Sequence, residues 1–136
     1  MRHVLFLVLI FSVTSAFAID QSQTLTRTQF EDISIQSGGV NINNFSFRED
    51  KSFWDRNMSV LKVNFSARNR NDSSKNFAIM LVGFDNANNI IWSMHLEPTM
   101  GILSENSTEQ ISDSVFCTAG TLNRTHRIWY RVIGNF

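Results

Sequence analysis

The stretch VLKVNFSAR, residues 60–68, decides the fold because its side chains alternate between apolar and polar from position 61 onward. The apolar positions are Leu61, Val63, Phe65 and Ala67, and lysine, asparagine, serine and arginine occupy the positions between and after them. Successive side chains of a β-strand point to opposite faces of the sheet. This stretch therefore predicts a strand with one buried face and one solvated face.

Similar signals follow along the chain. A polar loop over 69–76 leads to residues 77–84, which are apolar on both faces and predict either a doubly covered strand or a strand that seeks a partner. An asparagine-rich turn over 85–89 precedes a second alternating segment at 90–96, which Pro98 ends. The residues of that segment that we expect to point inward are Ile90, Trp92, Met94 and Leu96.

Further strands are predicted at residues 40–47, from about 109 to 117, and at 127–133, and a short one at 100–103. In the second of these, one face carries Ile111, Asp113, Val115 and Cys117. Residues 49–57 are charged and predict a connection or one helical turn, held down by Phe53 and Trp54. About seven short strands separated by turn signals, with no long helical period, predict an all-β antiparallel sandwich.

Residues 1–39 are predicted to precede this domain in two parts. Arg2 and His3 lead into an apolar run of about ten residues, which ends in the small-residue pattern Ala16-Phe17-Ala18. A helix of about ten residues rises about 15 Å, half of a bilayer's hydrocarbon core, so residues 1–18 favour a cleaved signal peptide over an anchor. Residues 19–39 predict a polar N-terminal arm, and residues 40–136 the sandwich domain.

The composition narrows the classes of partner. The chain has 12 basic and 12 acidic residues, whereas nucleic-acid binders usually carry a basic excess, so we expect no nucleic-acid partner. No later apolar run reaches transmembrane length, and we expect no integral membrane segment in the mature chain. Cys117 is the only cysteine, which leaves no partner for an intramolecular disulfide. We expect Cys117 to be buried as a small apolar side chain and not to form a disulfide with another chain.

The middle of the chain resembles the FxLYD-type, immunoglobulin-like domains of bacterial envelope proteins. The similar stretch runs from Asn64 to Val115 and includes residues 81–85 (Leu-Val-Gly-Phe-Asp). The aromatic–aspartate pair of that motif is kept, while Gly83 and Leu81 stand where the family has leucine and its first phenylalanine. The resemblance implies an extracytoplasmic, immunoglobulin-like β-sandwich, and it transfers no functional residue.

The sequence contains no recognisable catalytic constellation. There is no Gly-x-Ser-x-Gly nucleophile elbow, and Cys117 and His126 are a thiol–imidazole pair only if the fold brings them together. His95 and Glu97 share a strand face, but zinc needs three or four ligands. We therefore predict a protein that is not an enzyme and has no cofactor and no metal site.

Two groups of residues are candidates for binding. Arg127, Trp129 and Arg131 share the outward face of the last strand, where an aromatic ring between two guanidiniums suits stacking and anion recognition. The alternative is a structural cation–π ladder, or a tryptophan buried beneath the N-terminal arm.

The second group is Met80, Val82 and Phe84, which with Ala78 form an apolar patch if only one face of residues 77–84 is covered. The alternative is that the N-terminal arm, or Phe53 and Trp54, covers this face.

These observations favour an exported, non-catalytic binding module that contacts another protein in the bacterial envelope, in the periplasm or outside the cell. The contact surface would be the outward face of the last strand, with an edge available for strand addition. One alternative is a structural or fibre subunit that assembles by strand exchange. Another is a carrier of a small ligand or a metal.

Overall fold

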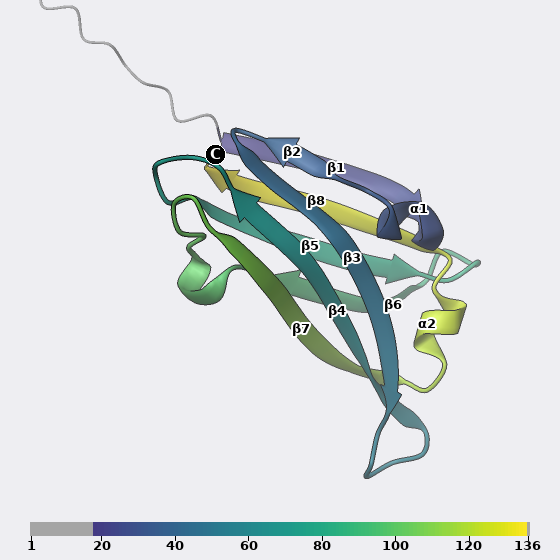
Figure 1. Ribbon diagram of the computed structural model, residues 1–136. Helices are drawn as coiled ribbons and strands as arrows, with labels where there is room; N and C mark the ends of the chain where they lie inside the picture. Colours follow the sequence, from purple (N-terminus) through teal and green to yellow (C-terminus); the bar gives the residue numbers. More distant parts are fainter. Residues whose placement is uncertain (1–17, 136) are drawn as a thin grey trace, which may run out of the picture.

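The computed structural model describes residues 18–135, which form two antiparallel four-stranded sheets packed face to face (Figure 1). One sheet has the strand order β1-β8-β5-β6, and the other has β2-β3-β4-β7. The strands are β1 (Ala18–Thr26), β2 (Ile35–Ser37), β3 (Val40–Lys51), β4 (Met58–Asn69), β5 (Asn76–Phe84), β6 (Ile90–Leu96), β7 (Thr108–Thr118) and β8 (Arg127–Asn135). The predicted all-β sandwich is confirmed, with eight strands in place of about seven.

Three short helices connect the strands: α1 (Arg27–Glu31), the 3-10 helix η1 (Thr99–Gly101) and α2 (Thr121–Arg124). No helix within residues 18–135 has the length and apolar character needed to cross a bilayer. The predicted signal peptide falls outside the described residues except for Ala18, which is the first residue of β1.

The strand with the clearest sequence pattern lies inside its sheet. β4 pairs with β3 on one side and with β7 on the other. Its four predicted inward residues, Leu61, Val63, Phe65 and Ala67, are all completely buried. The alternation in the sequence thus matches the core side of the sheet residue by residue.

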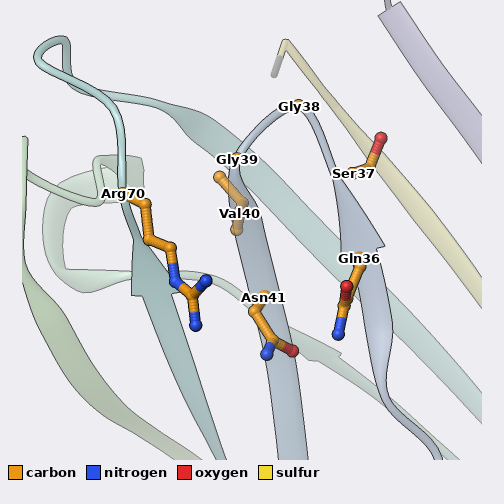
Figure 2. Close-up of a pocket in the computed structure, with 7 residues that line it drawn as sticks. All are labelled: Gln36, Ser37, Gly38, Gly39, Val40, Asn41 and Arg70. Carbon is orange, nitrogen blue, oxygen red and sulfur yellow. The ribbon is translucent and has the colours of Figure 1, made fainter.

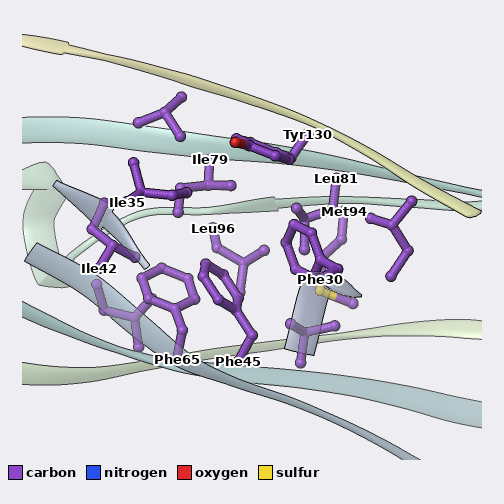
Figure 3. Close-up of a cluster of buried hydrophobic side chains, with 14 of the residues drawn as sticks. Phe30, Ile35, Ile42, Phe45, Phe65, Ile79, Leu81, Met94, Leu96 and Tyr130 are labelled. Atoms are coloured by element: carbon purple, nitrogen blue, oxygen red, sulfur yellow. The ribbon is translucent and has the colours of Figure 1, made fainter. Parts of the chain in front are cut away.

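The core between the sheets is rich in aromatic side chains (Figure 3). Phe30 of α1 is fully buried, and its ring centroid lies 4.6 Å from that of Phe45 and 5.6 Å from that of Tyr130. Phe45 belongs to one sheet and Tyr130 to the other. Phe30 therefore joins the two sheets at the end where α1 connects β1 to β2.

Two tight features set the register of the second sheet. Gly38 and Gly39 form the two-residue turn that joins β2 to β3, with φ values of 49° and 79°. Such a hairpin turn needs positive φ at both positions, which glycine adopts readily. At the same end, the buried Asn69 side chain donates to the carbonyl oxygens of Ser73 and Ser104, at 2.8 and 3.1 Å. These bonds tie the end of β4 to the loops that follow β4 and precede β7.

The segment 19–39, predicted as a polar arm, contains β1, α1 and β2 and belongs to both sheets. β1 lies at a sheet edge, where its partner is β8, and residues 21–24 are exposed on both faces of the strand. Because neither face of residues 21–24 is covered, this part of β1 shows no apolar alternation. Backbone pairing with β8 holds a strand that hydrophobic periodicity does not reveal.

Several smaller expectations are also corrected. Residues 49–51 continue β3, and Phe53 and Trp54 are exposed instead of tucked against the domain. Residues 100–103 form no strand, since η1 includes residues 100 and 101 and only Leu103 makes an isolated bridge to Lys75. Ile90 is 66% exposed because the pairing of β5 with β6 is interrupted by a bulge at this end of β6.

A close packing contact explains the glycine within β5. A Cβ atom at Gly83 would overlap Nε1 of Trp92, its partner residue on β6. The indole occupies the space that any larger residue needs, and its N–H donates to the Thr125 hydroxyl at 2.9 Å. Gly83, which departs from the FxLYD pattern, is therefore required by Trp92.

We expect Gly83→Ala to lower the free energy of unfolding by about 1–3 kcal/mol, because the added methyl overlaps a buried ring that cannot move freely. Urea denaturation measures the change. In a Trp92→Leu background the overlap is absent, so the same substitution should cost much less. Equal costs in the two backgrounds would show that the contact with Trp92 is not the cause.

Candidate functional site

The two residue groups singled out in the sequence lie side by side on the outer face of the β1-β8-β5-β6 sheet. β8 pairs with β5, and the register sets Arg127 beside Phe84, Trp129 beside Val82 and Arg131 beside Met80. All six side chains belong to the face that points away from the core, since Ile128, Tyr130 and Val132 of β8 are buried. The structure thus joins two separate sequence predictions into one surface, which we call the β8–β5 face.

The β8–β5 face has an apolar centre that sequence reasoning underestimated. Ala78 and Ile133 are a further cross-strand pair and extend the apolar strip beyond Met80. Met80 is 43% exposed and Ile133 46%, while Val82, Phe84 and Trp129 are half-buried. A shallow hollow at this end is lined by Ala78, Ile133 and Gly134 together with Glu97 and Gly101.

The strands on either side provide a polar border. On β1, Ser22 and Thr24 pair with Arg131 and Trp129, and on β6, Ser93 and His95 pair with Val82 and Met80. Four cross-strand neighbours of the apolar strip are therefore polar, while Ile90 of β6, which pairs with Phe84 and is 66% exposed, extends the strip at one end. An apolar centre inside a polar rim is the usual composition of a protein–protein contact surface.

Arginine and aromatic side chains interact within the β8–β5 face. The Arg127 guanidinium carbon lies 6.0 Å from the centroid of the Phe84 ring, at the outer limit of a cation–π contact. Arg127 and Arg131 are both half-buried, and they stand on either side of Trp129. Arg127 therefore makes the cation–π contact named as the structural alternative. This contact leaves part of the β8–β5 face exposed.

The alternatives in which other segments cover this face are not realised. Phe53 and Trp54 lie on the loop between β3 and β4, in the other sheet, and are 91% and 90% exposed. Residues 19–26, the start of the predicted arm, belong to a neighbouring strand in the same sheet and are not a layer above it. This also corrects the expectation of a free edge on the last strand, because β8 lies between β1 and β5.

The sequence also singled out Cys117 and the pair of His95 and Glu97. Cys117 is buried, as predicted, and its Sγ lies 3.7 Å from the Ser59 carbonyl oxygen. His95 and Glu97 lie on one exposed face, with 3.5 Å between Nε2 and Oε2. Among residues 18–135, no group of three or more His, Cys, Asp or Glu side chains is arranged to hold a metal ion.

A second hollow lies at the turn between β2 and β3 (Figure 2). Arg70, Asn41 and Gln36 line it, and the Ser34 hydroxyl donates to Oδ1 of Asn41 at 3.0 Å, which leaves the Asn41 amide nitrogen as a donor. This lining suits the oxygens of a carboxylate or phosphate group. Arg70 is exposed on an open turn, so water competes for each bond and such a group would bind weakly.

A third hollow, beside α2, is lined in part by the carboxylate of Glu49. Glu49 accepts from the backbone N–H of Gly120 at 2.6 Å and from that of Leu122 at 2.8 Å. Partial burial by itself would raise the pKa of Glu49, but the bonds from Leu122, Ser59 and Gly120 together hold it below its ordinary value. Glu49 therefore has a structural role, in fixing the first turn of α2 to β3.

Comparisons with known proteins add no family to this description. No protein-family model matches the chain, and no curated protein matches it.

We expect Glu49→Gln to lower the free energy of unfolding by about 1 kcal/mol at neutral pH, because the charged acceptor of two backbone donors is lost. A carboxyl whose pKa is lowered by folding stabilises the protein above its unfolded pKa, and this contribution disappears as the pH falls through the folded pKa. The difference from wild type should therefore shrink below the ordinary pKa of 4.5. Urea titrations across this range measure it.

Glu105→Gln is the matched control, since Glu105 is exposed on the turn before β7. It should leave stability nearly unchanged at every pH. A loss for Glu49→Gln that is as large in acid as at neutral pH would contradict the role given to the Glu49 charge.

Proposed function

We propose that this protein is an exported, non-catalytic binding module that contacts another protein of the bacterial envelope through the β8–β5 face. The observation that supports the proposal most strongly is the register between β8 and β5. It assembles Trp129, Val82 and Met80 into one apolar strip with Arg127 and Arg131 beside it.

The contrast between the two outer faces of the sandwich strengthens this proposal. Along β4, the outward side chains of Lys62, Asn64, Ser66 and Arg68 are polar, and their β7 neighbours Ser114, Ser112, Gln110 and Thr108 are polar too. The pair of Val60 and Phe116, with Phe116 70% exposed, is the apolar exception at one end of these strands. The core needs only the inner face of each sheet to be apolar. Apolar residues on the outer face of β5 and β8 therefore suggest a surface retained for contact with a partner.

The chemistry of the β8–β5 face indicates the kind of partner. An apolar strip with two guanidiniums fits a protein surface that has apolar side chains at its centre and Asp or Glu side chains at its edge. Buried aromatic and arginine side chains contribute much of the affinity at such contacts, while the charges favour correct orientation. The signal-peptide pattern at the N-terminus supports a location in the periplasm or outside the cell.

Strand exchange is a second candidate, supported by β1. This strand pairs with β8 from Ala18 to Thr26 at the edge of the sheet, and residues 21–24 are exposed. An edge strand held by backbone bonds more than by buried side chains is suited to exchange between copies. Such exchange would make the protein a structural subunit.

We expect the double substitution Met80→Ser and Trp129→Ser to reduce partner capture by about tenfold or more, because both changes remove apolar area from the centre of the face. The measurement uses tagged protein from cross-linked envelopes, with captured proteins quantified by mass spectrometry. Circular dichroism and urea denaturation establish that the variant remains folded.

The matched control changes Asn64 and Arg68 to alanine, on the outer face of the other sheet. Support for the proposal requires a protein whose capture falls with the first variant and persists with the control. Equal capture by wild type and by the β8–β5 variant would overturn it. Cross-links between copies alone would favour strand exchange.

A further inference from the structure

The loop between β3 and β4, residues 52–57, presents two large aromatic side chains to solvent. Phe53 is 91% exposed and Trp54 90%, and their rings meet edge to face with centroids 5.4 Å apart. Figure 1 shows this hairpin extending past the rest of the sandwich. Aromatic residues at such a projecting tip do not stabilise the core, so their exposure calls for another explanation.

The conformation of the tip is set by hydrogen bonds within it. The Ser52 hydroxyl accepts from the backbone N–H groups of Trp54 and Asp55 at 3.3 and 3.4 Å. The Asp55 carboxylate accepts from the N–H of Asn57 at 2.8 Å, and the Ser52 N–H donates to the Met58 carbonyl oxygen at 3.0 Å. These bonds order the backbone that carries the two rings, which limits the entropy lost when the rings bind a surface.

The charges around the tip are unevenly compensated. Asp50 is paired with Arg48 at 2.6 Å and with Lys62 at 3.0 Å, and these hydrogen-bonded partners lower its pKa. Lys51 and Arg56 flank the aromatic pair, are exposed, and make no ion pair within residues 18–135. Asp55 is exposed on the same tip and accepts from the N–H of Asn57, so residues 51–57 carry two cations and one anion, a net charge of 2 − 1 = +1, toward an anionic surface.

We propose that the tip of the β3–β4 hairpin docks onto an anionic lipid bilayer. Phe53 and Trp54 enter the interfacial region, where aromatic side chains are enriched, while Lys51 and Arg56 contact lipid phosphates. A bilayer accepts a small convex tip without a matching pocket. A stable protein contact instead buries about 800 Å² on each partner, far more than two side chains and their flanks supply.

The experiment uses the protein purified after export, mixed with vesicles of phosphatidylglycerol and phosphatidylcholine or of phosphatidylcholine alone. Trp54 is a built-in reporter, because Trp92 is 4% exposed and Trp129 is half-buried. We expect the fluorescence of Trp54 to shift to the blue with anionic vesicles, and we expect brominated lipids to quench this fluorescence. Binding should be weaker with neutral vesicles and at high salt.

Variants separate insertion of the tip from adventitious adsorption. Phe53→Ser with Trp54→Ser should reduce vesicle binding in sedimentation by roughly tenfold or more. Trp54→Phe should keep most of the binding and lose most of the fluorescence shift. Met100→Ser is the matched control, because Met100 is 92% exposed on η1, away from the hairpin, and its loss should change nothing.

Each outcome bears on the proposal. Loss of binding in the serine variant, with retention in Trp54→Phe and Met100→Ser, supports it. Absence of vesicle binding by the wild type, or equal binding by the serine variant, overturns it. All variants keep the same N-terminus and the same β8–β5 face, so failure here leaves the protein-binding proposal to be judged by its own capture experiment.

Discussion

The packing of the two inner sheet faces against each other is the interaction on which the rest of the structure depends. The chain has one cysteine, so no internal disulfide supports the sandwich. Stability must come from apolar burial, which is the dominant favourable term in folding. Aromatic contacts cross the core, including those of Phe30 with Phe45 and Tyr130, and residues from both sheets join one cluster.

That requirement constrains individual residues far from any binding surface. Trp92 fills its place between the sheets because Gly83 has no side chain, and its N–H finds the Thr125 hydroxyl. Thr125 in turn donates to the Thr121 carbonyl oxygen at 2.9 Å, so the polar atoms introduced with the indole are satisfied. The glycine at position 83 thus follows from local packing and carries no functional meaning by itself.

Because the core uses only the inner face of each sheet, the side chains on the two outer faces can differ in character. The outer face of β4 and β7 is polar from Lys62 to Arg68 and apolar only at the pair Val60 and Phe116, while that of β5 and β8 has a continuous apolar strip with arginines beside it. The β3–β4 hairpin carries two exposed aromatic rings beyond the sandwich. Together, the proposed protein contact at the β8–β5 face and the proposed bilayer contact at the hairpin tip would bring a partner close to a bilayer.

The sequence by itself determined the fold class and most of the strands. Alternation in β4 and in much of β6 is visible because each has one covered face and one wet face. It did not reveal β1, since both faces of residues 21–24 are exposed and the strand is defined mainly by its backbone pairing with β8. Local periodicity reports side-chain burial, and it is silent where burial does not distinguish the two faces.

The sequence identified the residues of the candidate surface but not that they lie together. The alternation over residues 127–133 predicts that Arg127, Trp129 and Arg131 point outward. Residues 77–84 are apolar on both faces, so the sequence predicts a patch of Met80, Val82 and Phe84 only if one face of that strand is covered. Only the tertiary structure decided that the two faces are one, because strand order and register depend on contacts between distant segments. The same reason explains the tip, since the exposure of Phe53 and Trp54 depends on how far the hairpin extends beyond the core.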